Sequence, residues 1–70
     1  MKILAERMKL LREERDIRQE DMAKNLGLSM SAYCRYEWGT REPTAPTIAA
    51  IADFFNVSAD YLLGRKDERG

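Results

Sequence analysis

Residues 18–39 read RQEDMAKNLGLSMSAYCRYEWG, and this stretch contains two predicted short helices separated by a tight turn. Ile17 and Met22 stand five positions apart, which is the spacing of a hydrophobic staple around a helix start. Gly27 supplies the stop, because glycine readily adopts the left-handed conformation that ends many helices. The first helix of the stretch is therefore predicted over residues 19–26.

A second helix is predicted directly after this turn. Leu28 and Tyr33 repeat the staple spacing, and Ser29 between them has a hydroxyl suited to capping the first turn. The helix is expected to run from Met30 to about Glu37.

This second helix has two different sides when its residues are placed at about 100° intervals. One side carries a mixed polar and apolar set, made up of Met30, Ser31, Cys34, Arg35 and Trp38. The opposite side carries Ala32, Tyr33, Tyr36 and Glu37. The helix is thus expected to contribute core on one side and a contact surface on the other.

The flanking sequence is also predicted to be helical. The stretch ILAERMKLLREER predicts a helix that ends near Arg15, and Thr44 caps the apolar-faced stretch APTIAAIADFF. Val57 and Leu62 form another staple around Ser58. No segment alternates with period two. The expected fold is a compact all-α domain of five helices.

Length and composition limit the classes of protein. The 70 residues make one domain, expected over 1–64, with a polar and frayed tail over 65–70. With one cysteine and no histidine, neither a disulfide, a metal site nor a catalytic constellation is expected. No apolar run approaches the roughly 18 residues of a membrane span. We therefore expect a cytoplasmic protein that is not an enzyme and needs no cofactor.

The run from Arg18 to Thr44, followed by IAAIADFFNVSADYLLG, resembles the phage repressor and Cro-like (XRE-type) helix-turn-helix domains over residues 3–64. The most specific elements of the match are Gln19, which opens helix two, and Ala23 and Gly27, which are expected at the tight helix crossing. The others are RYE at 35–37, REP at 41–43 and the terminal VSADYLLG. The resemblance implies a lambda-repressor-like fold with the helix-turn-helix at helices two and three. It also implies a nucleoid-associated transcriptional regulator, expected to be a repressor, that binds a palindromic operator in double-stranded DNA as a homodimer.

Roles for individual residues also come from the resemblance. The residues matching Gln19 and Arg41 contact the DNA phosphates and backbone in such proteins. Those matching Met30, Ser31 and Arg35 face base edges. The complete set of expected DNA contacts is Arg18, Gln19, Ser29, Met30, Ser31, Cys34, Arg35 and Arg41.

Physical chemistry supplies a reason for each base contact. Arg35 can direct two donors to guanine O6 and N7, the commonest specific contact in the major groove. Ser31 can donate or accept and so tolerates several bases, whereas Met30 offers only apolar contact, for example to a thymine methyl group. Gln19 is placed at a helix N-terminus, where free amide groups suit a phosphate.

Three positions need a choice between two interpretations. Arg18 stands where relatives usually have a serine or threonine N-cap, so it either reaches a phosphate or lies in solvent with Asp21 compensating. Trp38 either packs on the sugar-phosphate backbone or, as we predict, covers the Pro43 turn as a lid on the core. Cys34 is either a redox switch or, as we predict, a small groove-facing side chain.

Two sets of tertiary contacts are also expected. By the resemblance, Arg12 and Glu37 form a partly buried ion pair that joins helices one and three, although a plain surface salt bridge is the simpler alternative. An apolar strip on the C-terminal helix, involving Phe54, Tyr61 or Leu62, is the candidate dimer patch. The same residues fit equally well into one core.

A competing function is a protein-interaction module that keeps the fold without binding DNA. The net charge of zero and the apolar members of the outward set, Met30, Cys34 and Trp38, favour this hypothesis. Positive charge is concentrated toward the N-terminal part, because residues 1–18 carry six basic and four acidic side chains, whereas residues 44–64 carry two acidic ones and no basic one. Arg18, Arg35 and Arg41 favour DNA, because they are expected to flank the groove-facing helix while the acidic residues of the last two helices lie away from it.

Overall fold

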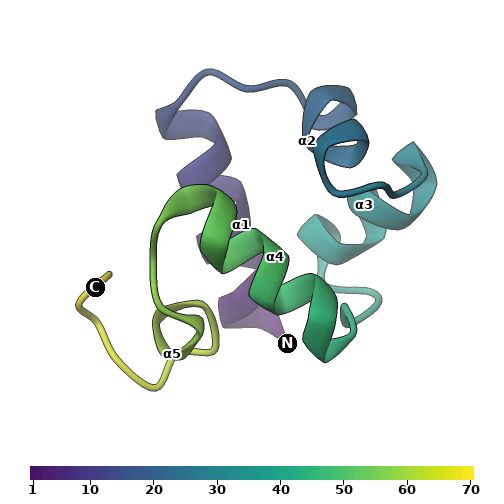
Figure 1. The fold of residues 1–70 in the computed structure, drawn as a ribbon. Helices are drawn as coiled ribbons and strands as arrows, with labels where there is room; N and C mark the ends of the chain where they lie inside the picture. Colours follow the sequence, from purple (N-terminus) through teal and green to yellow (C-terminus); the bar gives the residue numbers. More distant parts are fainter.

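Helices form all of the regular structure of the protein. The computed structural model describes the whole chain, from Met1 to Gly70. The helices are α1 (Lys2–Glu14), α2 (Gln19–Asn25), α3 (Met30–Trp38), α4 (Ala45–Phe55) and α5 (Ala59–Leu62), and no residue lies in a strand (Figure 1). The predicted all-α fold of five helices is confirmed, and none of these helices has the length and apolar character needed to cross a membrane.

Side-chain caps explain where the last three helices begin. The Ser29 hydroxyl accepts a hydrogen bond from the amide of Ala32 at 3.1 Å, and the Ser58 hydroxyl accepts one from the amide of Tyr61 at 3.0 Å. Thr44 caps α4 in the same way. Each cap satisfies an amide that has no partner in the first helical turn. These three predicted caps are confirmed.

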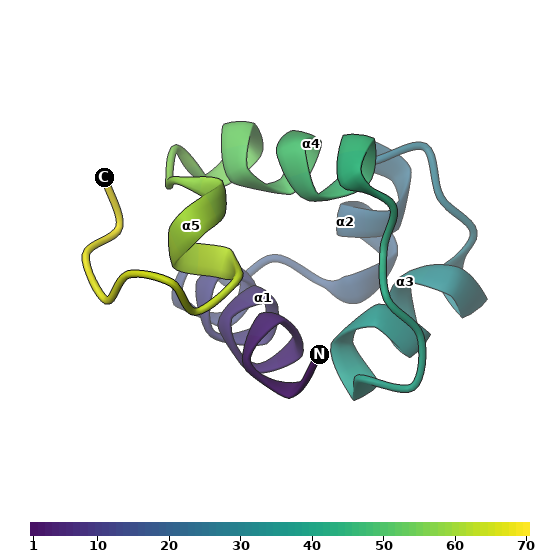
Figure 2. The same ribbon diagram turned by 90° about the horizontal axis from the view of Figure 1, so that it is seen from below.

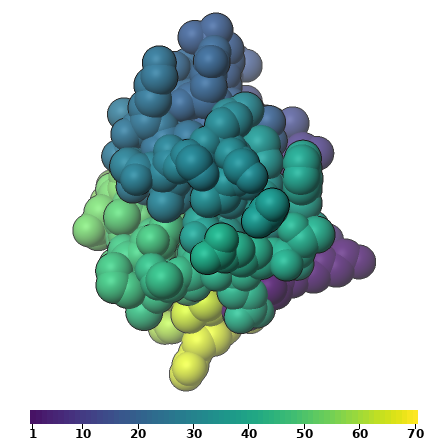
Figure 3. All heavy atoms as spheres, turned by 90° about the vertical axis from the view of Figure 1, so that its right-hand side faces the viewer, coloured from purple at the N-terminus to yellow at the C-terminus, as the bar shows by residue number.

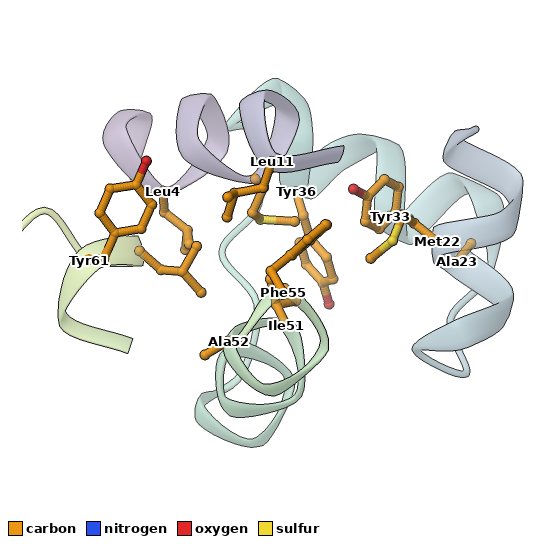
Figure 4. Close-up of a cluster of buried hydrophobic side chains, with 12 residues drawn as sticks. Leu4, Leu11, Met22, Ala23, Tyr33, Tyr36, Ile51, Ala52, Phe55 and Tyr61 are labelled. Carbon is orange, nitrogen blue, oxygen red and sulfur yellow. The ribbon is translucent and has the colours of Figure 1, made fainter. Parts of the chain in front are cut away.

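One apolar core joins all the helices (Figure 4). Its members are Leu4, Met8 and Leu11 of α1, Met22 and Ala23 of α2, Tyr33 and Tyr36 of α3, Ile51, Ala52 and Phe55 of α4, and Tyr61 and Leu62 of α5. Both tyrosines of α3 therefore lie on the core side, as predicted. Burying one large apolar side chain contributes about 1.5–3 kcal/mol to the free energy of folding. The packing of this cluster is therefore the main interaction that holds α3 in place.

The arrangement leaves α3 at one end of the molecule. In Figure 2, α1 and α4 lie on opposite sides of the core, α5 closes one end, and α2 with α3 forms the other. Tyr61 and Leu62 are buried, at 5% and 0% exposure. These two residues therefore belong to the core and do not form the candidate dimer patch, while Phe54 is only partly buried against the same cluster.

The C-terminal tail docks on the helices, in contrast to the frayed tail that the sequence predicts. The Arg7 guanidinium donates to the carbonyl of Lys66 at 2.6 Å and to the Asp67 carboxylate at 3.0 Å. Arg69 pairs with both carboxylate oxygens of Glu14, at 2.8 and 2.7 Å. The polar composition of the tail conceals these contacts because their partners lie more than fifty positions away in the sequence. The tail lies at the end of the molecule opposite α3 (Figures 1 and 2).

Candidate nucleic-acid interface

The turn between α2 and α3 sets the angle at which α3 is presented. Gly27 has a φ of 68°, a left-handed conformation that glycine adopts without strain. The amide of Leu28 then donates to the carbonyl of Ala23 at 2.8 Å and closes the turn. A Cβ at Gly27 would meet nothing within 4 Å, so close helix packing, which the resemblance led us to expect, does not require glycine here. The left-handed backbone conformation is what favours glycine at this position. Ala23, at 3% exposure, is the small residue at the packed helix crossing.

The outer side of α3 is open to solvent. Met30 is 46% exposed, and Ser31 and Arg35 are also exposed. Arg35 forms no ion pair within the chain. Figure 3 shows this face, with the teal atoms of α3 in the centre and the atoms of α2 above them. The helical period thus places three of the expected base-reading residues correctly on the surface.

Ser29 and Arg41 flank this exposed side. Ser29 is exposed, and its oxygen accepts the capping hydrogen bond from Ala32, which leaves the hydroxyl proton free to donate. Arg41 is exposed in the turn after α3 and has no acidic partner in the chain. Both residues lie where an external ligand can reach them.

Cys34 is buried, which corrects its predicted groove-facing position. Its exposed fraction is 8%, and its thiol donates to the Oε1 atom of Gln19 at 3.6 Å. The 100° spacing placed Cys34 within the outward arc, between Met30 and Trp38, but α2 packs over that part of α3 through Gln19. Cys34 therefore supports Gln19 from within and is removed from the set of surface contacts.

Gln19 has a side chain that is partly buried and held by two neighbours. Its Nε2 atom donates to the Oε1 atom of Glu37 at 3.2 Å, while its own oxygen accepts the thiol hydrogen bond from Cys34. The carboxamide orientation is therefore set by α3, and one of its two N–H groups is already used. The second N–H group has no partner within the chain.

The carboxylate of Glu37 is the centre of a polar network beneath the interface. Its Oε2 atom accepts from Arg12 Nε at 2.6 Å and from the hydroxyl of Tyr33, and its Oε1 atom accepts from Arg12 Nη2 at 3.1 Å. The Glu37 and Arg12 side chains are 1% and 12% exposed. The predicted buried ion pair between α1 and α3 is confirmed. The hydrogen bonds from Tyr33 and Gln19 were not predicted, because no sequence pattern marks them.

The network also determines the ionisation of its members. Burial alone raises the pKa of Glu37, but hydrogen bonds from Arg12, Tyr33 and Gln19 outweigh burial and lower the pKa below its usual value. Burial raises the pKa of Tyr33, and its hydrogen bond to the carboxylate raises it further. The carboxylate is therefore ionised and the phenol neutral, which is the state that the hydrogen bonds require.

Arg18 lies in solvent beside acidic neighbours. It forms ion pairs with Glu20 at 2.9 Å and with Asp21 at 3.1 Å, and its side chain is 73% exposed. It makes no side-chain cap for α2. Of the two interpretations of Arg18, the structure of the free chain matches the one in which Asp21 compensates for the missing cap.

Trp38 is exposed, and the predicted lid over the Pro43 turn is wrong. The indole has an exposed fraction of 68%. The reason is that α3 remains helical through residue 38, so Trp38 continues the outward arc. The chain turns toward Pro43 only after Gly39, which has a left-handed φ of 75°.

Known proteins are similar to this chain over the segment that contains α2 and α3. The helix-turn-helix family model matches residues 8–62. The uncharacterized HTH-type transcriptional regulator YqaE of Bacillus subtilis is 38% identical over 68 residues, which cover 96% of this chain and 59% of that protein. The cryptic phage CTXphi transcriptional repressor RstR of Vibrio cholerae is 38% identical over 53 residues, covering 76% of this chain and 48% of the repressor.

A third relative is closer in length. The uncharacterized HTH-type transcriptional regulator YazB of Bacillus subtilis is 40% identical over 60 residues, covering 86% of this chain and 87% of that protein. The chain spans only 55% to 59% of the length of the first three curated relatives that it matches. No solved structure matches the chain. The family match over most of the chain and the geometry of α2 and α3 lead to one conclusion: this chain belongs to the helix-turn-helix family, in its phage repressor and Cro-like (XRE) branch of transcriptional regulators.

Proposed function

We propose that the protein is a repressor that binds a short palindromic operator in double-stranded DNA as a homodimer, with α3 of each copy in the major groove. The observation that carries this proposal is the exposed side of α3. Ser31 and Arg35 lie there without partners, while Tyr33 and Tyr36 anchor the opposite side in the core. A helix held rigidly from behind, with free polar groups in front, fits the docking geometry of this motif.

Individual residues are assigned by their chemistry. Arg35 donates two hydrogen bonds to a guanine, Ser31 bonds a neighbouring base edge, and Met30 contacts an apolar group such as a thymine methyl. These three residues provide the sequence specificity. The contacts are few, so a single copy reads a short half-site.

Contacts to the DNA backbone position the helix. Arg41 and the free N–H group of Gln19 bind phosphates, and the proton of the Ser29 hydroxyl donates to a third one. Arg18 exchanges its acidic partners for a phosphate when DNA is bound. Each cation that neutralises a phosphate adds about 0.9 to the magnitude of the slope of log binding constant against log salt concentration.

Two lines of reasoning support a dimeric repressor. One short helix reads too few base pairs for a unique site, and a second copy on a symmetric operator doubles the number of contacts. RstR, which is similar to this chain over 53 residues, is named as a transcriptional repressor.

The test is the selection of bound sequences from a random duplex pool. We expect a two-fold symmetric consensus with half-sites about one helical turn apart, and affinity that falls steeply with salt. Arg35→Ala should lose discrimination at one position of each half-site, by about 1–3 kcal/mol. Lys66→Ala is the matched control, because it removes one positive charge from the tail at the opposite end of the molecule, and it should leave the consensus unchanged. Absence of any enriched sequence would contradict the proposal.

A protein-interaction module is the second candidate function. The zero net charge and the exposed Met30 and Trp38 favour it, because exposed apolar side chains suit a protein partner. The same selection experiment separates the two functions, since an interaction module enriches no duplex sequence.

A further inference from the structure

Trp38 is the most exposed large apolar side chain of the molecule. Its exposed fraction of 68% compares with 46% for Met30 and 45% for Leu10, the next two. The ring lies at the last residue of a helix whose other side is anchored in the core. A rigidly mounted aromatic ring that is mostly exposed is suited to contact something outside the chain.

The position of Trp38 along α3 relates it to the width of a DNA groove. Trp38 follows Ser31 by seven residues, so the two side chains lie on the same side of the helix and about 10 Å apart along its axis. The major groove of DNA is about 12 Å wide. When Ser31 lies against base edges, Trp38 is therefore close to a strand that borders the groove.

The charges around Trp38 favour a polyanion as its partner. Arg35 and Arg41, three residues away on either side along the chain, are exposed and have no acidic partner. The two carboxylates between residues 30 and 52 are both engaged, because Glu37 is buried with Arg12 and Glu42 pairs with the terminal amino group at 2.8 Å. This end of α3 thus combines an apolar ring with unopposed positive charge.

We propose that the indole of Trp38 packs on a deoxyribose of the DNA strand that borders the groove. The ring face covers the apolar edge of the sugar, and the indole N–H is free to donate to the adjacent phosphate. Such a contact binds every DNA sequence equally and adds affinity without reading a base. The inference rests on the proposed function, and it names a contact that α3 makes beyond its base-reading side chains.

Salt dependence distinguishes this contact from an ionic one. A neutral indole displaces no counterion, so Trp38→Ala should weaken binding at every salt concentration and leave the slope of the salt dependence unchanged. The expected loss is about tenfold, the amount that burial of roughly 55 Å² of apolar surface provides. The loss should be equal for the selected duplex and for an unrelated one. In contrast, Arg41→Ala should lower the steepness of the slope by about 0.9.

Two further variants control for indirect effects. Trp38→Phe keeps an aromatic ring and should retain most of the affinity. Leu10→Ala removes another exposed apolar side chain, from α1, and should leave binding unchanged. Far-UV circular dichroism of each variant checks that it is folded, and the exposed positions of both side chains mean that no large change is expected.

Fluorescence gives a direct readout, since Trp38 is the single tryptophan of the chain. Titration with duplex should quench its emission or move it to shorter wavelength as the ring leaves water. If the wild type binds duplex while Trp38→Ala binds equally well and the emission does not change, the inference is overturned and the DNA-binding proposal stands. If no duplex binds at all, both proposals fail, and the exposed ring belongs to the surface of an interaction module.

Discussion

Replacement of Glu37 by alanine is expected to remove about 3–5 kcal/mol from the free energy of unfolding. The carboxylate accepts hydrogen bonds from Arg12, Tyr33 and Gln19, and its side chain is 1% exposed. Its removal leaves the Arg12 guanidinium, only 12% exposed, without a carboxylate. An unpaired charge held away from water is costly, and the substitution also leaves a cavity between α1 and α3.

The assay is equilibrium unfolding in urea, followed by far-UV circular dichroism. Small domains have about 5–15 kcal/mol of stability in total, so the variant should keep only a part of it. In thermal unfolding the midpoint should fall by roughly 12 °C or more, at about 4 °C or more per kcal/mol for a domain of this size. Both values are large enough to measure with ordinary precision.

A double variant tests whether the unpaired charge of Arg12 causes the loss of stability. Arg12→Met combined with Glu37→Met replaces the whole ion pair by apolar side chains and leaves no unpaired charge. It should therefore be more stable than Glu37→Ala alone. A cost below about 1 kcal/mol for Glu37→Ala, or a double variant no more stable than the single one, would refute the account based on a buried charge.

Three further outcomes are expected. Burial raises the pKa of Glu37, but the hydrogen bonds that its carboxylate accepts lower the pKa overall, so the ionised form stabilises the fold above the unfolded pKa of about 4.3. This contribution is lost as pH falls through the folded pKa, so the stability of Glu37→Gln should fall less than that of the wild type in acid unfolding below about pH 4.3. Arg18→Ser should raise the thermal midpoint by adding the missing cap of α2, and a salt slope less steep by about 0.9 would show that Arg18 contacts phosphate. Gly39→Ala should cost roughly 1 kcal/mol in urea unfolding, because its φ of 75° is strained for alanine although Ala5, at 3.6 Å, leaves room for the methyl group.

Much of the fold is predictable because helix boundaries depend on local contacts. The staple and cap patterns around Ser29 and Ser58 involve residues only three to five positions apart, and the capping bonds form as predicted. The left-handed Gly27 and Gly39 end α2 and α3 for an equally local reason. Local chemistry of this kind can be recognised without knowing the tertiary arrangement.

The candidate interface is predictable only in part. Helical periodicity correctly puts Met30, Ser31 and Arg35 on the exposed side of α3. It fails for Cys34, which lies within the same arc, because α2 packs over that part of α3. Its burial against Gln19 depends on the angle between α2 and α3, which periodicity does not contain.

The helices, their caps and the family of the chain are predictable from the sequence, because they depend on neighbours along the chain and on recognisable motifs. Three features depend on the folded chain: Glu37 orients Gln19, Trp38 is largely exposed, and Arg69 holds the tail on Glu14. These features follow from contacts between residues far apart in sequence, or from the absence of such contacts. The angles at which helices pack decide which side chains meet, and these angles result from the packing of the whole core.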